Sequence, residues 1–309
     1  MSSRVVTAAL AASALGVGVL VGLAAPRGIQ DDATASSSDP QVARLTADLT
    51  SKDEWISALG DAAISGRIEG MRVVLLVTDG TPSATVDEVS AALERGGATV
   101  ESTALLGAEW WDPTKSSFRG ELADQVSASV AGVDGLGTTD VLEHAIVQAI
   151  VPGALPRGGD EPEQGTDPAE TGTVDSQAVL LEVLTRAEIL TVDHPAVEGA
   201  DAVVVISGAG PEGAGETLNA AASAWERYLG STLVVVAGDA SASGGDASGT
   251  VTEAVAAGVQ QPQSARPSVV VINDTNLAAA QVVMALTEQA SGGTGVYGNV
   301  GEFDLIAVP

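Results

Sequence analysis

A glycine pattern at residues 208–213 is the stretch of this sequence most typical of a chemical site. Gly208, Gly210 and Gly213 match the spacing G-x-G-x-x-G between a predicted strand and a predicted helix. In dinucleotide-binding proteins such glycines let the backbone turn tightly and approach a pyrophosphate, and an acid at the end of the next strand binds the ribose. Asp239, which ends the next predicted strand, has the residue type for that role.

Two acids oppose this nucleotide interpretation. Glu212 and Glu216 fall at the N-terminus of the predicted helix, where their carboxylates would complement the helix dipole and repel a pyrophosphate. A plain strand-to-helix turn is the alternative, and it is the interpretation that we favour. A nucleotide-binding α/β enzyme that uses residues 208–213 is therefore a secondary hypothesis, and we expect no cofactor.

Residues that bind transition metals or act as catalytic bases are few. Cysteine is absent, and with two histidines and three methionines no soft copper site can be built from residues that are close in sequence. We interpret Glu143-His144, on a predicted helix, and Asp193-His194, in a predicted loop, as ordinary surface pairs. His194 has the chemistry of a base for a serine nucleophile, but no G-x-S-x-G motif supports a hydrolase. The sequence leaves the metal-binding residues unknown, assigns no catalytic residue and predicts a protein that is not an enzyme.

The composition describes a folded and strongly acidic protein. Its 309 residues suffice for one large domain or two small ones, and 45% of them are hydrophobic. The 41 acidic residues against 13 Lys and Arg give a formal net charge of −28 at pH 7. Such a surface repels phosphate backbones and concentrates cations, so we expect no nucleic-acid partner.

An apolar N-terminal segment predicts that the chain enters a membrane. The run Val5–Ala25 carries no charge, and at 1.5 Å per residue it spans about 30 Å, the thickness of the hydrocarbon core of a bilayer. The apolar core of a secretory signal is shorter, roughly 7–15 residues, although Gly22 and Ala24 offer a small-x-small cleavage pattern. Length favours an uncleaved anchor over residues 1–27, with a cleaved leader as the alternative. Both place the bulk of the chain outside the cytoplasm.

Small residues give this predicted membrane helix a nearly bare face. Gly18 and Gly22 are four residues apart, so they lie on the same face of a helix, where small side chains allow close helix packing. We predict that Gly18 and Gly22 are membrane-helix packing residues. The alternative is that glycine is simply frequent, since the chain contains 36 glycines.

Residues 28–70 are predicted to form a spacer followed by one amphipathic helix. Asp39-Pro40 is a helix start signal, and Gly66 and Gly70 end the segment. Seven positions between them follow the three-four spacing of a heptad repeat, and six of the seven are apolar. They are Val42, Leu45, Leu49, Lys52, Ile56, Leu59 and Ala63. A parallel coiled coil, and with it a homo-oligomer, is one interpretation. Packing of an amphipathic helix on the following domain is the other.

The remainder of the chain alternates predicted strands and helices. This alternation predicts an α/β fold with a mostly parallel sheet covered by helices, as in Rossmann-like or flavodoxin-like proteins. Residues 71–152 form a first α/β part and residues 176–309 a second. The segment 153–175 between them is rich in proline, glycine and acids, and it is predicted to be an exposed, disordered insertion. We interpret the aromatic pair Trp110-Trp111 as core packing or a partner contact.

Several of these stretches together resemble the MctB-type copper transport family, the actinobacterial copper transport outer membrane proteins. The resemblance rests on LGVGVLVGL, GRIEGMRVVLLVTDG with ALERGGATV, LLEVLTRAEILTV with ADAVVVISG, STLVVVAGD, and SVVVINDTNLAAAQVVMALTEQASGGTGVYG. It implies a role in copper efflux or homeostasis in the cell envelope, with a membrane and copper ions as partners. It implies no catalytic residues.

A single predicted span constrains how such a protein could act. One helix cannot enclose a channel, so ion conduction would need several assembled copies or a second protein. We therefore expect a membrane-anchored envelope protein that acts by assembly and contact. An envelope scaffolding protein without transport activity is the alternative.

Overall fold

The computed structural model describes residues 40–133, 136–154, 173–196, 199–208, 214–229, 231–237, 267–272, 275–300 and 303–305. The chain divides into two compact units, Met1–Thr46 and Ala47–Pro309. Several predictions fall outside the described residues. They concern the membrane segment with Gly18 and Gly22, most of the insertion 153–175, Gly210, Gly213, Asp239 and a predicted helix at 248–257. Within the described residues, no helix combines the length and the apolar character needed to span a bilayer.

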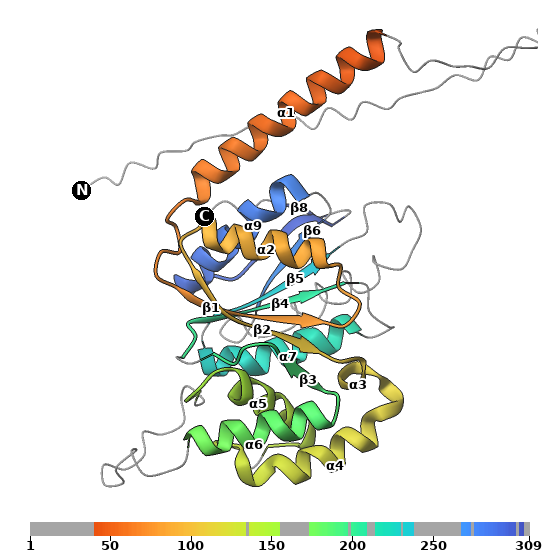
Figure 1. Ribbon diagram of the computed structural model, residues 1–309, viewed down its shortest axis with the longest axis vertical. Coiled ribbons are helices and arrows are strands. Elements are labelled where there is room, and N and C mark those ends of the chain that lie inside the picture. Colours follow the sequence, from red (N-terminus) through yellow and green to blue (C-terminus); the bar gives the residue numbers. More distant parts are fainter. Residues whose placement is uncertain are drawn as a thin grey trace, which may run out of the picture. The chain divides into compact units, whose positions relative to one another are not determined.

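The described strands of the unit Ala47–Pro309 form one eight-stranded sheet (Figure 1). The strand order is β3-β2-β1-β4-β5-β6-β7-β8. The strands are β1 (Arg72–Thr78), β2 (Thr99–Leu106), β3 (Leu190–Val192), β4 (Ala202–Ser207), β5 (Thr232–Ala237), β6 (Ser268–Ile272), β7 (Val296–Val300) and β8 (Phe303–Leu305). Only β3 and β8, at the two edges, run antiparallel to their neighbours. The predicted α/β fold with a mostly parallel sheet is confirmed.

The central strands are buried on both faces. Every residue of β4, β5 and β6 is buried, and so are six of the seven residues of β1. Their sequences are continuous runs of Val, Leu and Ile, because a parallel strand with helices on both faces has no solvent side that would take polar residues. These four strands therefore form the buried centre of the sheet, which we call the frame.

Helices cover both faces of this frame. They are α2 (Ser83–Arg95), α3 (Ala108–Trp111), α4 (Ser116–Val126), α5 (Thr138–Ile150), α6 (Thr173–Arg186), α7 (Ala214–Leu229) and α9 (Thr275–Ala290), with short 3₁₀ turns at Pro113–Lys115 and Ser127–Ser129. A further helix, α1 (Pro40–Ile64), precedes β1 in the chain. Figure 1 shows α2 and α9 on one side of the sheet and α4 to α7 on the other. Because side chains alternate along a strand, Val73 and Leu75 pack under α2 and α9, whereas Val74 and Leu76 belong to the opposite core cluster.

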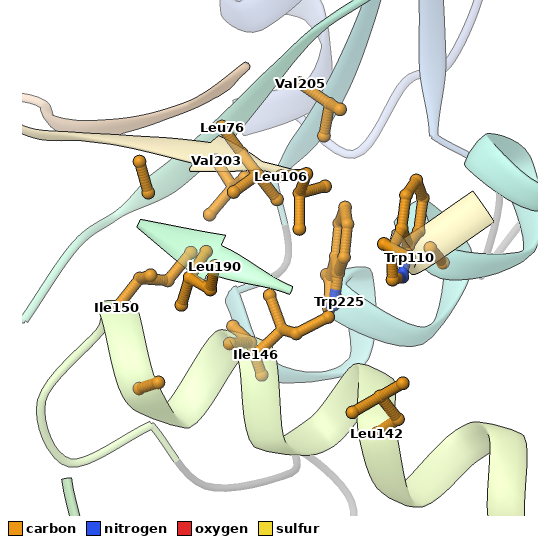
Figure 2. Packing of buried hydrophobic residues seen from close by; sticks show 14 of the residues in the cluster. Leu76, Leu106, Trp110, Leu142, Ile146, Ile150, Leu190, Val203, Val205 and Trp225 are labelled. Carbon is orange, nitrogen blue, oxygen red and sulfur yellow. The ribbon is translucent and has the colours of Figure 1, made fainter. Parts of the chain in front are cut away.

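The tryptophan pair lies in the larger of these two clusters. Trp110 is almost fully buried, and Trp111 lies at the margin of the core. Trp110 stacks on Trp225 of α7, with ring centroids 6.2 Å apart. In Figure 2 both rings lie near Leu106 and Ile146, between the sheet and α5. Core packing, one of the two interpretations of this pair, is confirmed.

Two strands at the C-terminal end were not expected from the sequence. β7 extends the parallel sheet beside β6, and β8 folds back against β7 as an antiparallel edge. Tyr297 of β7 is buried and donates its hydroxyl to the Glu288 carboxylate of α9. The sequence of this stretch does not predict strands, because it is rich in glycine and lacks a run of β-branched residues.

The junction between β2 and the edge strand β3 depends on a close backbone approach. Gly107, directly after β2, donates its N–H to the Ile189 carbonyl oxygen at 3.0 Å. A Cβ atom on Gly107 would clash with the Glu188 carbonyl oxygen. Glu188 itself has a φ of 58°, in the left-handed region. Only glycine at position 107 therefore lets the chain before β3 lie against the end of β2.

We predict that Gly107→Ala destabilises the protein by about 2 kcal/mol, because a backbone atom must move to admit the methyl group. Gly137→Ala is a matched control, because both glycines directly precede a helix and have nearly the same backbone angles. Gly107 has φ −70° and ψ 162°, and Gly137 has φ −72° and ψ 159°. The nearest atom to a Cβ on Gly137 is Asp140 Oδ2, at 3.9 Å. Urea unfolding measures both variants. Equal effects of the two substitutions would contradict the close-approach argument.

Candidate functional site

The carboxyl ends of β1 and β4 are where this topology would place a ligand. β2 lies on one side of β1, and β4 to β6 continue on the other, so the direction of strand addition reverses between β1 and β4. Open α/β sheets bind their ligands at such a reversal, in the crevice beyond the carboxyl ends of the strands. The loops that follow the two strands begin at Asp79 and at Gly208, the first glycine of the G-x-G-x-x-G pattern.

Hydroxyl groups link these two strand ends to each other. Thr81 accepts a hydrogen bond from the Gly208 N–H at 3.0 Å and donates its own hydroxyl to the Thr78 carbonyl oxygen at 2.7 Å. The Thr78 hydroxyl donates to Ser207 Oγ at 3.2 Å. Thr78 and Ser207 are fully buried. The first amide that a phosphate could use is therefore already bound within the chain.

Gly208 has a packing role at this position. A Cβ atom there would lie 3.0 Å from the Gly80 carbonyl oxygen and 3.2 Å from Thr81 Cα. The glycine thus allows the two loops to touch, which supports the interpretation as a plain strand-to-helix turn. Gly210, Gly213 and Asp239 lie outside the described residues, so the nucleotide hypothesis stays a prediction for them.

Glu143 and His144 are buried in the core, and their assignment as a surface pair was wrong. Glu143 is 6% exposed and His144 is 2% exposed. Their helix, α5, contacts α4, α6 and α7, and nearly every residue from Val141 to Ile150 is buried. The sequence of α5 indicated this burial, because a helix that is apolar on almost every side is a buried helix. A Glu-His pair within it shares that burial.

Glu143 joins two helices to α5, one through its side-chain carboxyl and one through its main-chain carbonyl. Trp110 Nε1 of α3 donates to Glu143 Oε1 at 3.0 Å, and Trp225 Nε1 of α7 donates to the Glu143 carbonyl oxygen at 2.9 Å. Burial raises the pKa of Glu143 to about 8, against the opposing effect of the Trp110 hydrogen bond. At neutral pH most of these carboxyls carry a proton, which avoids the large cost of a charge in the core. We interpret Glu143 as a structural residue that holds α3 and α7 to α5, since so buried a group does not reach a substrate.

The described residues offer little to a metal ion. They contain no group of three or more His, Cys, Asp or Glu side chains that could hold one. His144 packs edge-on against the Tyr228 ring inside the core, with ring centroids 4.7 Å apart. His194 and Asp193 are exposed, as expected of a surface pair. For a copper cargo, neither histidine belongs to a donor set within the described part of the chain.

Helix α1 presents an apolar surface to solvent. It begins at Pro40, as the start signal predicts. Three of its heptad leucines are more than half exposed: Leu45 at 57%, Leu49 at 59% and Leu59 at 62%. We call these three leucines the α1 seam; Trp55, beside it, is 68% exposed. Packing of the helix on the domain, one of the two interpretations of this repeat, does not cover the seam, whereas Ile64 at the end of the helix is buried in the core.

The described geometry defines an α/β protein that offers surfaces for contact. The chain belongs to the family described as "Copper transport outer membrane protein, MctB", whose model matches residues 3–306. This match covers nearly the whole chain, and it confirms the resemblance that the sequence shows. A comparison with curated proteins gives no match.

We predict that the stability of the protein falls with rising pH through Glu143. Its folded pKa of about 8 lies above the ordinary value of 4.5, so between these values the folded state binds more protons than the unfolded state. The contribution is fully present below about pH 4.5 and declines progressively until about pH 8. In Glu143→Gln, which resembles the protonated carboxyl, this decline is absent. Urea unfolding of both proteins at several pH values measures the difference, and parallel pH profiles would contradict the assignment.

Proposed function

We propose that this chain is a membrane-anchored protein of the cell envelope that takes part in copper efflux or homeostasis without being an enzyme. The observation that carries the proposal is the family match over residues 3–306. The bulk of the chain, including the α/β unit, lies outside the cytoplasm in this proposal. Residues 1–27 are the anchor, and Gly18 and Gly22 pack it against other membrane helices.

Assembly is the means by which such a protein would act. The described residues provide no cluster of metal ligands, and one anchor cannot enclose a pore. Contact with other copies or with a transporter then has to supply the path for copper. The net charge of −28 concentrates cations at the surface of the assembled protein.

The α1 seam is the surface that we assign to homo-oligomer formation. Leu45, Leu49 and Leu59 occupy core positions of a heptad repeat and are exposed in the single chain. Burial of one leucine side chain contributes roughly 1.5–3 kcal/mol, so pairing of two such helices in parallel would be favourable. A second copy supplies the same seam in register, which is why a parallel coiled coil fits this surface.

We predict that Leu49→Glu/Leu59→Glu converts the oligomer to a monomer, because two acids in each copy would face each other across the seam. The matched control is Ser51→Glu/Ala58→Glu, which adds the same charge to exposed positions of the same helix outside the seam. Sedimentation of the full chain in detergent measures the mass. A monomeric wild-type chain, or equal behaviour of both variants, would contradict the coiled coil.

We predict that cells lacking the gene accumulate copper and become copper-sensitive, and that the wild-type gene restores both. The measurement is growth on copper together with cell-associated copper by mass spectrometry. Rescue by the control variant but not by the seam variant would tie the role to assembly. Unchanged copper content in the deletion strain would reject the proposal and favour the envelope scaffold without transport activity.

We predict that the mature protein from membrane fractions retains Met1 or begins at Ser2. The apolar run Val5–Ala25 is long enough to span the bilayer and therefore to anchor the chain. Mass spectrometry of the intact N-terminus decides between the two expectations. A water-soluble protein that begins after Ala24 would show that the segment is a cleaved leader.

A further inference from the structure

Half of β2 forms an open edge of the sheet. β3 pairs only with Ala104, Leu105 and Leu106 at the carboxyl end of β2. The other half, Thr99–Thr103, pairs with β1 on one side and with no described strand on the other. At about 3.3 Å per residue this open half is about 17 Å long. On this side its backbone groups pair with no described strand, and they can pair with another extended chain, which is how exposed edges bind peptides.

A hollow lies beside this open edge. Its volume is about 380 Å³, and it is lined by Val100, Glu101, Ser102, Thr103, Asp193 and His194. The chain leaves the sheet after Val192, so the hollow begins where a longer β3 would have continued. The Ser102 hydroxyl donates to the His194 carbonyl oxygen and fixes this loop beside the strand. A hollow of this size falls within the range of ligand pockets.

The acidic side chains at the hollow favour a positively charged occupant. Glu101 and Asp193 are carboxylates, and none of the lining residues is Lys or Arg. A metal ion is not favoured, because no group of three ligands occurs within the described part of the chain. A second copy of this edge would bring its own Glu101 and Asp193 toward the first pair. A cationic segment would pair with the Glu101 and Asp193 carboxylates, which neither a metal ion nor a second copy of this edge would do.

The irregular pairing of β2 strengthens this selection. Val73 pairs with Val100 and Val74 with Ser102, so Glu101 is the extra residue of a bulge. Bulges and charged side chains are the means by which exposed edges avoid indiscriminate pairing. Here the edge discourages neutral or acidic strands, while the same carboxylate attracts a basic one.

We propose that the open half of β2 is a docking site for an extended, lysine- or arginine-bearing segment of a partner protein, which adds to the sheet as a strand and pairs its cations with Glu101 and Asp193. The acidic segment 153–175 of this chain does not fit, because its six acids repel the same carboxylates. The proposal rests on the β2 edge and the loop beside it, and it is independent of any role in copper homeostasis.

The test is fluorescence anisotropy of the full chain with a labelled peptide of alternating lysine and valine. Two peptides of equal length are controls: one has glutamate in place of lysine, and one has proline in place of valine. The proline peptide keeps the charge but lacks every second amide hydrogen, and its proline rings hinder strand pairing. We expect micromolar binding of the lysine-valine peptide, and binding at least about tenfold weaker for both controls.

Two charge-reversal variants locate the site. Glu101→Lys/Asp193→Lys lowers the affinity for the lysine-valine peptide at least about tenfold. Asp87→Lys/Asp124→Lys makes the same change of charge at exposed positions elsewhere, and its affinity stays within about twofold of the wild-type value. Glu101→Gln/Asp193→Asn guards against misfolding of the reversal variant and is expected to weaken binding in the same direction. Equal binding of the proline peptide, or equal loss in both reversal variants, would overturn the proposal in favour of general attraction to an acidic protein.

Discussion

Burial of both faces of the central parallel strands is the constraint on which the rest of this structure depends. β4, β5 and β6 are buried throughout and consist mainly of Val, Leu and Ile, so helices must cover each face of the sheet. The polar groups within those layers must then be neutral or paired. Glu143 meets this requirement by holding a proton and accepting the Trp110 hydrogen bond. The contact between this carboxyl and Trp110 is the link through which we expect the packing of α3 on α5 to depend on pH.

The carboxyl ends of β1 and β4 are linked by hydrogen bonds within the chain. Thr78, Thr81 and Ser207 bind one another and the Gly208 amide where related topologies bind ligands. Among the described residues, two surfaces that stay open are the exposed α1 seam and the part of β2 that no described strand pairs on its outer side. Both suit contact with another chain, since one offers leucines and the other offers backbone hydrogen-bonding groups.

Local patterns predicted the elements that depend on local physics. The buried strands follow from continuous runs of Val, Leu and Ile, and the start of α1 follows from Pro40. Patterns did not predict that Glu143 and His144 are buried, because their surroundings come from α4, α6 and α7. The strands β7 and β8 were missed since their glycine-rich sequence has no apolar period. The antiparallel direction of β3 was likewise beyond the sequence, since a strand of three residues carries no sign of its partner.

The sequence by itself determined the α/β class, the family, the acidic charge and the apolar stretches that call for burial or for a membrane. These properties are sums over residues or follow from spacing along one helix or strand. The tertiary structure alone decided that the Gly208 amide is occupied, that Glu143 is buried in the core and that half of β2 meets no described strand on its outer side. Each of these depends on which distant segments meet, as Thr81 with Gly208, Trp110 with Glu143 and β3 with β2. Contacts between distant segments are set by how the whole chain packs, and a short stretch of sequence does not contain that information.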